Sequence, residues 1–175
     1  NMENRVERYT YHWFDKRRDV LLVVIEDMTD EFETDSVTGA RNRTGFAHKA
    51  EEILKQNQNG SYAVLYFNIQ RFKAINDLFG YEAGDEVLCQ WVNSLRNSFL
   101  RPSVIGRIEA DRFALLVETK YLDLKRIPEL THRVYYRKNS KVDVYGRCGI
   151  YYIQDNNERS ITDMCDKAKL AKLQI

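Results

Sequence analysis

The chain opens with two short segments whose apolar and polar positions follow the pattern of β-strands. Aromatic and polar residues alternate from Arg8 to Trp13, and after a charged turn an unbroken apolar run covers Val20 to Ile25. Alternation with a period of two, together with aromatic and β-branched residues, is typical of strands. The pattern predicts a β-hairpin, and the acidic stretch 26–34 after it predicts a short helical linker.

From residue 35 onward, segments with apolar residues every three or four positions alternate with short apolar runs, which predict helices and strands respectively. The predicted helices cover residues 46–54, 71–80, 85–101, 122–136 and 160–173; the predicted strands cover 62–67, 104–108, 113–117 and 142–153, the last bent at Gly146. This order of elements is typical of an α+β fold, in which helices pack against a mixed, mainly antiparallel sheet.

Composition and charge narrow the classes of function. With 43% apolar and 12% aromatic residues over 175 positions, the chain can bury a core of ordinary size. Its formal charge of +1 lacks the basic excess that drives nucleic-acid binding. Cys89, Cys148 and Cys165 are widely spaced, which argues against disulfides or a zinc site and favours a reducing, cytoplasmic setting. The longest apolar run is far shorter than the ~20 residues of a membrane span.

Four separate segments carry motifs in matching order and spacing. They are Asp35 to Arg43, Asn68 to Asp77, Gly80 to Asp85, and Arg107 to Phe113, the last reading Arg-Ile-Glu-Ala-Asp-Arg-Phe. These segments resemble the motifs of the GGDEF family, the diguanylate cyclases that join two GTP molecules into cyclic di-GMP. Four matches in register are far more specific than one. The resemblance covers residues 35–172 and implies a nucleotide-cyclase-like fold, with a ferredoxin-like core and a five-stranded sheet flanked by helices.

The resemblance implies a Mg²⁺ site whose two carboxylates lie at the positions of Asn68 and Asp111. Asp111 keeps the charge and reach of a ligand, whereas Asn68 offers only a neutral amide oxygen. Hard cations prefer anionic oxygen ligands, and a bound metal stabilises transition-state charge by on the order of several kcal/mol. We therefore expect Mg²⁺ to bind weakly with GTP, and metal-dependent cyclisation to be strongly impaired.

The family signature is altered in the turn that begins at Glu109. Glu109 and Ala110 replace two glycines that, in the family, let the backbone approach the nucleotide. Glu109 also places a carboxylate near the expected triphosphate, which it repels. Arg112 stands where the family has glutamate and could pair with phosphate or with Glu109, while Phe113 is unchanged. No catalytic residue is therefore assigned among the signature positions.

Guanine recognition is better preserved than the metal site. By resemblance, Asn76 and Asp85 match the residues that read the base, and an amide with a carboxylate can satisfy guanine while rejecting adenine. Phe72 and Lys73 match a loop that offers backbone N–H groups and a lysine to the phosphates. The sequence therefore predicts that guanine nucleotide binding survives without turnover.

Two further family features are changed. The product-inhibition motif Arg-x-x-Asp aligns with Leu100 and Ser103, with Arg101 one place out of register, so we expect no feedback inhibition. Residues 164–172 resemble the last helix of the family with one residue missing, a form that is frequent where a GGDEF domain precedes an EAL phosphodiesterase domain. The resemblance thus implies other domains of the same chain as partners, an EAL domain among them.

The same residues also have purely structural interpretations. Asp111 and Arg112 could be solvated turn residues, and Asn68 could be an inert polar residue at a strand end. Asn76 and Asp77 could cap a helix end, and Asp85 could be the N-cap of the helix that follows. The patterns alone do not choose between these roles and the functional ones.

The sequence divides at residue 35. Residues 1–34 form a hairpin and linker, interpreted as the end of a truncated, PAS-like sensor domain, and residues 35–175 form a degenerate GGDEF domain. We expect a regulatory module in cyclic di-GMP signalling that senses GTP or mediates homodimer formation. It would lie in the cytoplasm, with any membrane anchor outside this segment. A weak diguanylate cyclase and a structural linker without nucleotide are the alternatives.

Overall fold

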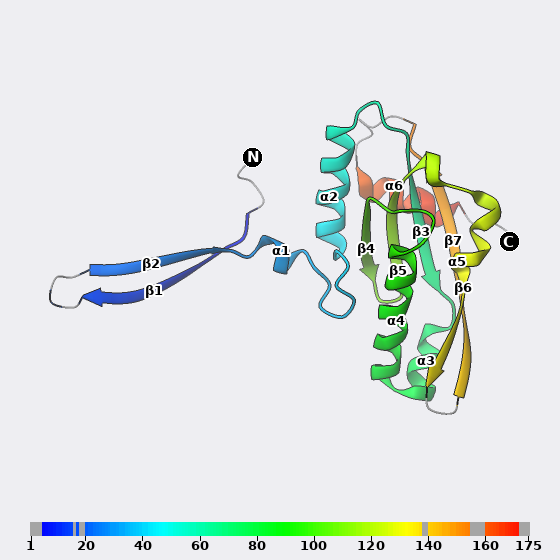
Figure 1. Ribbon diagram of the computed structural model, residues 1–175, viewed down its shortest axis with the longest axis horizontal. Helices are drawn as coiled ribbons and strands as arrows, with labels where there is room; N and C mark the ends of the chain where they lie inside the picture. The colour runs from blue at the N-terminus through cyan, green and yellow to red at the C-terminus, as the bar shows by residue number, and fades with distance from the viewer. Residues whose placement is uncertain (1–4, 16, 18–19, 138–139, 155–159, 172–175) are drawn as a thin grey trace.

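The centre of the molecule is a five-stranded sheet with the order β4-β5-β3-β7-β6, all named neighbours being antiparallel (Figure 1). The computed structural model describes residues 5–15, 17, 20–137, 140–154 and 160–171. The strands are β3 (Tyr62–Ile69), β4 (Val104–Glu109), β5 (Arg112–Glu118), β6 (His132–Arg137) and β7 (Ser140–Tyr152). An isolated parallel bridge between Arg41 and Gly106 adds the segment before the first long helix to one edge.

Helices cover both faces of this sheet. They are α2 (Arg43–Gln56) and α6 (Ile161–Leu170) on one face, and α3 (Phe72–Phe79) and α4 (Tyr81–Arg96) on the other. Alternate residues of β3 divide between two apolar clusters: Val64 packs with Phe46 of α2, and Leu65 packs with Trp91 of α4. Because both faces of β3 are buried, its sequence is a continuous apolar run rather than an alternating one.

This architecture confirms the fold class predicted from the sequence, an α+β fold with a five-stranded sheet flanked by helices. The predicted last helix is observed as α6, while residues 172 and 173 of that prediction lie outside the described residues. Among the helices that the structure describes, none is long and apolar enough to cross a membrane.

The prediction of a helix over residues 122–136 is wrong. After β5 the chain forms two short 3₁₀ turns and one α-helical turn before it enters β6; these are η1 (Thr119–Tyr121), η2 (Leu124–Arg126) and α5 (Pro128–Thr131). Pro128 can begin a helix but cannot continue one from the preceding residues. The next residues pair with β7, from His132 opposite Tyr145 onward. Ile127 and Leu130 are both buried in the core, and because they lie three positions apart in the sequence they have the spacing of apolar residues on a helix.

The predicted N-terminal hairpin is observed as β1 (Glu7–Asp15) and β2 (Val20–Asp27). The two strands form a separate antiparallel sheet, which Figure 1 shows projecting from the main domain rather than packing on it. Every residue of β2 is exposed, and Trp13 of β1 is 59% exposed. The interpretation of this hairpin as part of a sensor domain stays a prediction.

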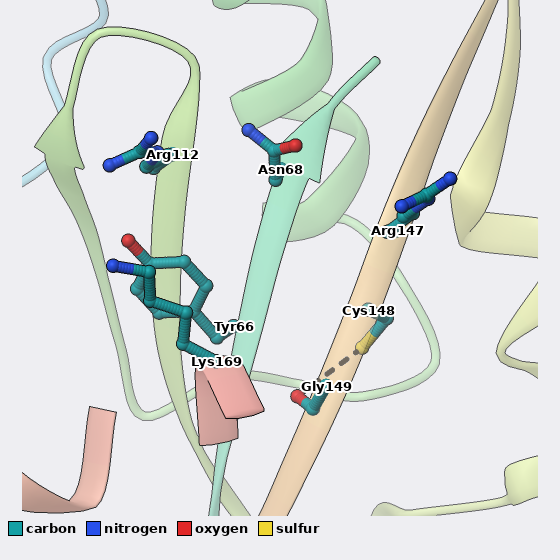
Figure 2. A pocket seen from close by; sticks show the side chains of 7 residues that line it. All are labelled: Tyr66, Asn68, Arg112, Arg147, Cys148, Gly149 and Lys169. Atoms are coloured by element: carbon teal, nitrogen blue, oxygen red, sulfur yellow. Dashed lines mark hydrogen bonds between the residues drawn. The ribbon is translucent and has the colours of Figure 1, made fainter. Parts of the chain in front are cut away.

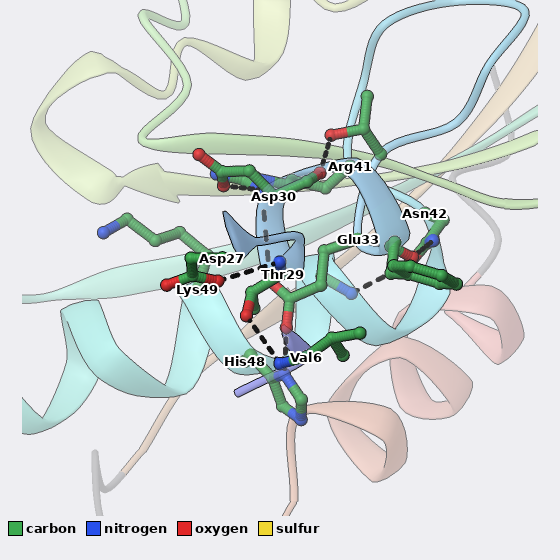
Figure 3. A network of polar contacts seen from close by, with 12 residues as sticks. Val6, Asp27, Thr29, Asp30, Glu33, Arg41, Asn42, His48 and Lys49 are labelled. Atoms are coloured by element: carbon green, nitrogen blue, oxygen red, sulfur yellow. Dashed lines mark hydrogen bonds and ion pairs between the residues drawn. The ribbon is translucent and has the colours of Figure 1, made fainter. Parts of the chain in front are cut away.

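A polar network fixes the linker helix α1 (Thr29–Phe32) to the start of the main domain (Figure 3). Arg41 Nη1 lies 2.7 Å from Asp30 Oδ1, and His48 Nδ1 lies 2.5 Å from Glu33 Oε1. The backbone N–H of Asn42 donates to the carbonyl of Glu33 at 2.8 Å. The linker is therefore held by side-chain and backbone contacts together, and it is not a free tether.

Gly149 in β7 lets α6 approach the sheet closely. A Cβ at this position would lie 1.9 Å from the carbonyl oxygen of Ala168 and 2.7 Å from that of Ala171. Because backbone atoms cannot rotate away as a side chain can, Gly149→Ala should lower the free energy of unfolding by about 1–3 kcal/mol. Chemical denaturation measures the change, with Lys141→Ala on an exposed part of the same strand as the control. An unchanged stability for Gly149→Ala would contradict the close packing of α6 on β7.

Candidate functional site

A cleft of about 710 Å³ opens where β3 ends, beside the start of α3 and the turn that joins β4 to β5. Its volume lies within the ~300–1,000 Å³ range of small-molecule sites. It is lined by Asn68, Ile69, Gln70, Arg71, Phe72, Lys73, Asn76, Ala110, Asp111 and Arg147. Two motifs far apart in the sequence, residues 68–77 and 107–113, thus meet in one cleft.

Six of the residues predicted from the sequence line this cleft, and four do not. Asn68, Phe72, Lys73, Asn76, Ala110 and Asp111 line it, whereas Asp85, Glu109, Arg112 and Phe113 are not part of its wall. Phe113 is fully buried in the core. Arg147, which the sequence did not single out, enters the cleft from β7 because its strand position pairs with Asn68.

A strained residue turns the chain from β3 into α3. Arg71 has φ 54°, a left-handed conformation that is uncommon for residues other than glycine. The backbone N–H of Gln70 is already used, since it donates to the carbonyl of Tyr145 at 2.7 Å. The first N–H groups of a helix have no intrahelical acceptor, so those of Phe72 and Lys73 are available to an anion. Sparsely populated backbone conformations of this kind gather at binding sites.

The two positions of the family's metal carboxylates lie side by side and are bonded to each other. The Asn68 amide Nδ2 donates to the Asp111 carboxylate Oδ2 at 3.0 Å. Among the described residues, no group of three His, Cys, Asp or Glu side chains could hold a metal ion. Of the two positions only Asp111 carries a charge, and one of its two oxygens accepts a hydrogen bond from Asn68, so Asp111 is the side chain here that would hold Mg²⁺ together with substrate phosphates.

Side chains of the signature turn contact other residues of the same turn. Arg112 Nη1 lies 2.8 Å from Glu109 Oε2, and Arg107 Nε donates to the carbonyl of Ala110 at 2.7 Å. Ala110 has φ 45°, where glycine is free of strain and alanine is not. Of the two roles that the sequence left open for Arg112, the structure shows pairing with Glu109. This pair neutralises the carboxylate that was expected to repel a triphosphate.

Asn76 presents an unusual acceptor. Its Oδ1 is buried and has no hydrogen-bond partner among the described residues. The atom lies against α4, because a Cβ on Gly84 would be only 1.9 Å from it. A buried polar atom without a partner costs free energy, and such atoms call for an explanation such as a ligand. Asn76 therefore remains the strongest candidate for contact with a guanine base.

The structural interpretations of Asn76 and Asp85 as caps are wrong. α3 ends at Phe79, and its C-cap is Gly80, with φ 83°, four residues beyond Asn76. α4 begins at Tyr81, so Asp85 lies inside the helix rather than at its N-cap, and its side chain is exposed. Asp85 is the residue after Gly84, which contacts Asn76, but it does not line the cleft.

A second part of the signature motif anchors the start of the domain. Arg107 Nη1 lies 3.2 Å from Asp35 Oδ1, and Asp35 Oδ2 accepts hydrogen bonds from the hydroxyl and backbone N–H of Thr38 at 2.7 and 2.8 Å. Burial acts to raise the pKa of Asp35, but the Thr38 hydrogen bonds and the charge of Arg107 outweigh it and hold the pKa below its usual value.

Asp35 should make the stability of the domain sensitive to acid. Because its pKa is lower in the folded state, the ionised carboxylate stabilises the fold at neutral pH, and this contribution is lost as pH falls below about 4 through the folded-state pKa. Urea denaturation at a series of pH values should show a smaller acid-induced loss for Asp35→Asn than for the native chain. Asp77→Asn, on the exposed side of α3, is the control. Equal losses in the native chain and Asp35→Asn would contradict this role.

The positions that align with the family's inhibitory motif face different environments. Leu100 is fully buried in the core. Arg101 is exposed and has its guanidinium 5.3 Å from the centre of the Tyr121 ring. Leu100 therefore supplies no charge to an inhibitory ligand, and the absence of feedback inhibition stays a prediction.

Comparison with known proteins identifies the family. The family model described as "Diguanylate cyclase, GGDEF domain" matches residues 32–174. The chain therefore belongs to the GGDEF domain family. The signature turn from Glu109 to Phe113 and the strand end at Asn68 are the places where it departs from the family motifs.

Relatives and solved structures agree with this assignment. The chain is 30% identical to the diguanylate cyclase DgcM of Escherichia coli over 116 residues, which is 59% of this chain and 28% of DgcM. It is 31% identical to the probable diguanylate cyclase DgcE of the same organism over 159 residues, which is 79% of this chain and 14% of DgcE. The chain thus spans less than a third of the length of these curated relatives.

The fold is shared with solved GGDEF structures. A sensory box/GGDEF family protein from Caulobacter crescentus superposes with a TM-score of 0.69 at 20% identity, covering 79% of this chain and 94% of that one. The coiled coil and GGDEF domain of DgcB from Caulobacter crescentus, solved in complex with c-di-GMP, gives a TM-score of 0.63 at 18% identity over 81% of this chain and 79% of that one. At these identities the likeness concerns the fold alone.

Proposed function

We propose that this chain is a regulatory GGDEF domain that binds a guanine nucleotide and does not convert it into cyclic di-GMP. The observation that carries the proposal is the hydrogen bond between Asn68 and Asp111. It shows an amide in place of the second carboxylate at the metal position, and this amide engages one oxygen of the carboxylate that is left, so a divalent ion would be held weakly. Without a divalent ion bridging the phosphates, charge developing during phosphoryl transfer loses its main stabiliser.

Nucleotide binding is supported by the open cleft. Asn76 offers a buried, unpartnered acceptor, and Lys73 lies at the start of α3 beside free backbone N–H groups. The alternative of a linker without nucleotide required Glu109 to close the pocket. Glu109 instead pairs with Arg112 and does not line the cleft.

Selectivity between purine nucleotides tests the binding half of the proposal. A side-chain amide that hydrogen-bonds the edge of one base loses that bond with a base that presents a different edge. Calorimetric titration should therefore show GTP binding at least roughly tenfold more tightly than ATP. Equal affinities for the two nucleotides, or no binding of either, would contradict a guanine site.

A weak diguanylate cyclase is the second candidate. It is favoured by the retention of Asp111 in the cleft and by relatives whose names are those of diguanylate cyclases. In that case Asp111 and backbone carbonyls would hold Mg²⁺, and two copies would face each other to condense two GTP molecules. Direct measurement of cyclic di-GMP separates the two candidates.

We further propose that the nucleotide signal is passed to neighbouring domains in cyclic di-GMP signalling. The curated relatives are several times longer than this chain, which leaves room for other domains. An EAL phosphodiesterase domain in the same chain, or a second copy of the domain in a homodimer, would receive the signal. The full-length protein, assayed for cyclic di-GMP hydrolysis with and without GTP, should respond to GTP. Hydrolysis at the same rate in both cases would contradict transfer of the nucleotide signal to such a domain.

A further inference from the structure

The N-terminal hairpin leaves one face of its two-stranded sheet uncovered. Tyr11 lies opposite Val23, and the pairs on either side continue the same face, because side chains that are opposite each other or two positions apart point the same way. All the side chains of this face are aromatic or aliphatic, and each is between 42% and 61% exposed. This set, called the hairpin face below, consists of Tyr9, Tyr11, Trp13, Leu21, Val23 and Ile25.

The other side of the hairpin has a mixed character. Its positions are Arg8, Thr10 and His12 of β1, and Leu22, Val24 and Glu26 of β2. A strand pair with one apolar and one mixed face is typical of a sheet that packs on a partner with one side only. In the main domain α6 packs on the sheet, and the space left there is a pocket of about 240 Å³ beside Tyr66 and Gly149 (Figure 2). The hairpin face has no such cover in the part of the chain that the structure describes, and the hairpin projects from the main domain (Figure 1).

The size of the hairpin face is sufficient for an interface between two copies. Half-exposed aromatic and aliphatic side chains of this number expose roughly 500 Å² in each copy, which is large for the surface of a monomer. Packing the same face of two copies together would remove about 1,000 Å² from solvent, the lower bound for a specific interface. A lone two-stranded hairpin is only marginally stable in water, whereas two of them packed face to face enclose a core.

Charges at the two ends of the hairpin favour a second copy and set its direction. The segment between the strands reads Asp15-Lys16-Arg17-Arg18-Asp19, whereas residues 26–33 at the base contain five acidic side chains and no basic one. Two hairpins aligned turn to turn would bring like charges together. A two-fold axis across the strands instead places each basic turn beside the acidic base of the other copy.

We propose that the hairpin face is a self-association surface, on which two copies of this chain pack face to face with their strands in opposite directions. Tyr11 and Val23 then lie at the two-fold axis, and Trp13 of each copy packs near Tyr9 of the other. Because β1 is about 30 Å long, the main domains lie at opposite ends of the pair. This association goes beyond the proposed nucleotide function and does not depend on the nucleotide cleft.

Sedimentation velocity of the native chain without nucleotide, over roughly 1–200 µM, tests this proposal. We expect a reversible equilibrium of monomer and dimer with a dissociation constant of about 1–100 µM, since the interface is small. Val23→Lys places a charge on the hairpin face and should weaken the dimer by at least roughly tenfold. Val24→Lys is the matched control. It adds the same side chain to the other face of β2, where Val24 is 37% exposed, and should leave the equilibrium unchanged.

Charge reversal tests the direction of packing. Glu31 is exposed at the acidic base, and Glu31→Lys should weaken the dimer several-fold, as should Arg17→Glu in the basic turn. The double variant should recover most of the native affinity, because opposite charges again face each other. A turn-to-turn dimer would behave differently, since Arg17→Glu would then relieve repulsion and strengthen it.

Several results would overturn this proposal. They are a native chain that stays monomeric over the whole series, equal weakening by Val23→Lys and Val24→Lys, and charge reversals whose effects do not compensate. Circular dichroism verifies that each variant is folded, and the two lysine variants carry the same cost for the strand. GTP titration separates this proposal from the proposed function: Val23→Lys should bind GTP like the native chain, and a native dimer that binds no GTP would contradict the proposed function alone.

Discussion

Reversing four substitutions should turn this chain into a cyclase. The variant with Asn68→Asp, Glu109→Gly, Ala110→Gly and Arg112→Glu keeps Asp111 and regains the second metal carboxylate. It also has a turn without the strain of Ala110, which has φ 45°. A metal site worth several kcal/mol of transition-state stabilisation corresponds to roughly a thousandfold in rate. Chromatography of cyclic di-GMP formed from GTP and Mg²⁺ should therefore show the variant to be faster than the native chain by about that factor.

A matched control isolates the metal ligand within this set. The same variant without Asn68→Asp keeps the amide that donates to Asp111 at 3.0 Å, so it should stay close to the native rate. Equal activity of the two variants would show that the signature turn, and not the metal position, limits catalysis. A native chain as active as the full variant would contradict the loss of turnover altogether.

Substitution of Asn76 should weaken guanine nucleotide binding. Asn76→Ala deletes the buried acceptor, and hydrogen bonds of this kind are worth about 1–3 kcal/mol, so GTP affinity should fall roughly 10- to 100-fold. Gly84→Ala should cause a similar loss, although Gly84 itself does not line the cleft. Its new Cβ would lie 1.9 Å from Asn76 Oδ1 and would rotate the amide away.

The stability of the Gly84→Ala variant keeps this test interpretable. Alanine inside a helix is favoured over glycine by about 1 kcal/mol, which offsets the cost of moving the Asn76 side chain. The double variant Asn76→Ala with Gly84→Ala should then bind GTP no more weakly than Asn76→Ala alone, because the alanine at 84 would meet no amide. Asp77→Ala, on the exposed side of α3, is the control. Full GTP affinity in Gly84→Ala would contradict the role of Asn76.

Much of the fold could be predicted from the sequence because the spacing of apolar residues along the chain matches the residues that are buried in the structure. The apolar run of β3 and the helical spacing of α4 reflect elements whose faces pack directly on the core. The segment 122–136 could not be predicted in this way. Its apolar residues Ile127 and Leu130 reach the core from short turns, and residues after Pro128 form a strand only because β7 extends far enough to pair with them.

The candidate site could be predicted only where it depends on contiguous motifs. Motif spacing brought Asn68, Asp111 and Asn76 to attention, and the structure gathers them in one cleft. Arg147 belongs to no recognised motif, because the register between β3 and β7 places it beside Asn68, and this register cannot be read along the chain. The sequence likewise did not decide whether Arg112 pairs with phosphate or with Glu109, because the pairing depends on the geometry of the turn.

Binding and turnover followed in the same sample give the most direct test of the central claim. The native chain is titrated with GTP in the presence of Mg²⁺ in a calorimeter, and the contents are then separated by chromatography to quantify cyclic di-GMP. We predict saturable binding of GTP and no cyclic di-GMP above the protein-free control. Formation of cyclic di-GMP at the rate of the four-substitution variant would contradict a domain that binds the nucleotide without converting it.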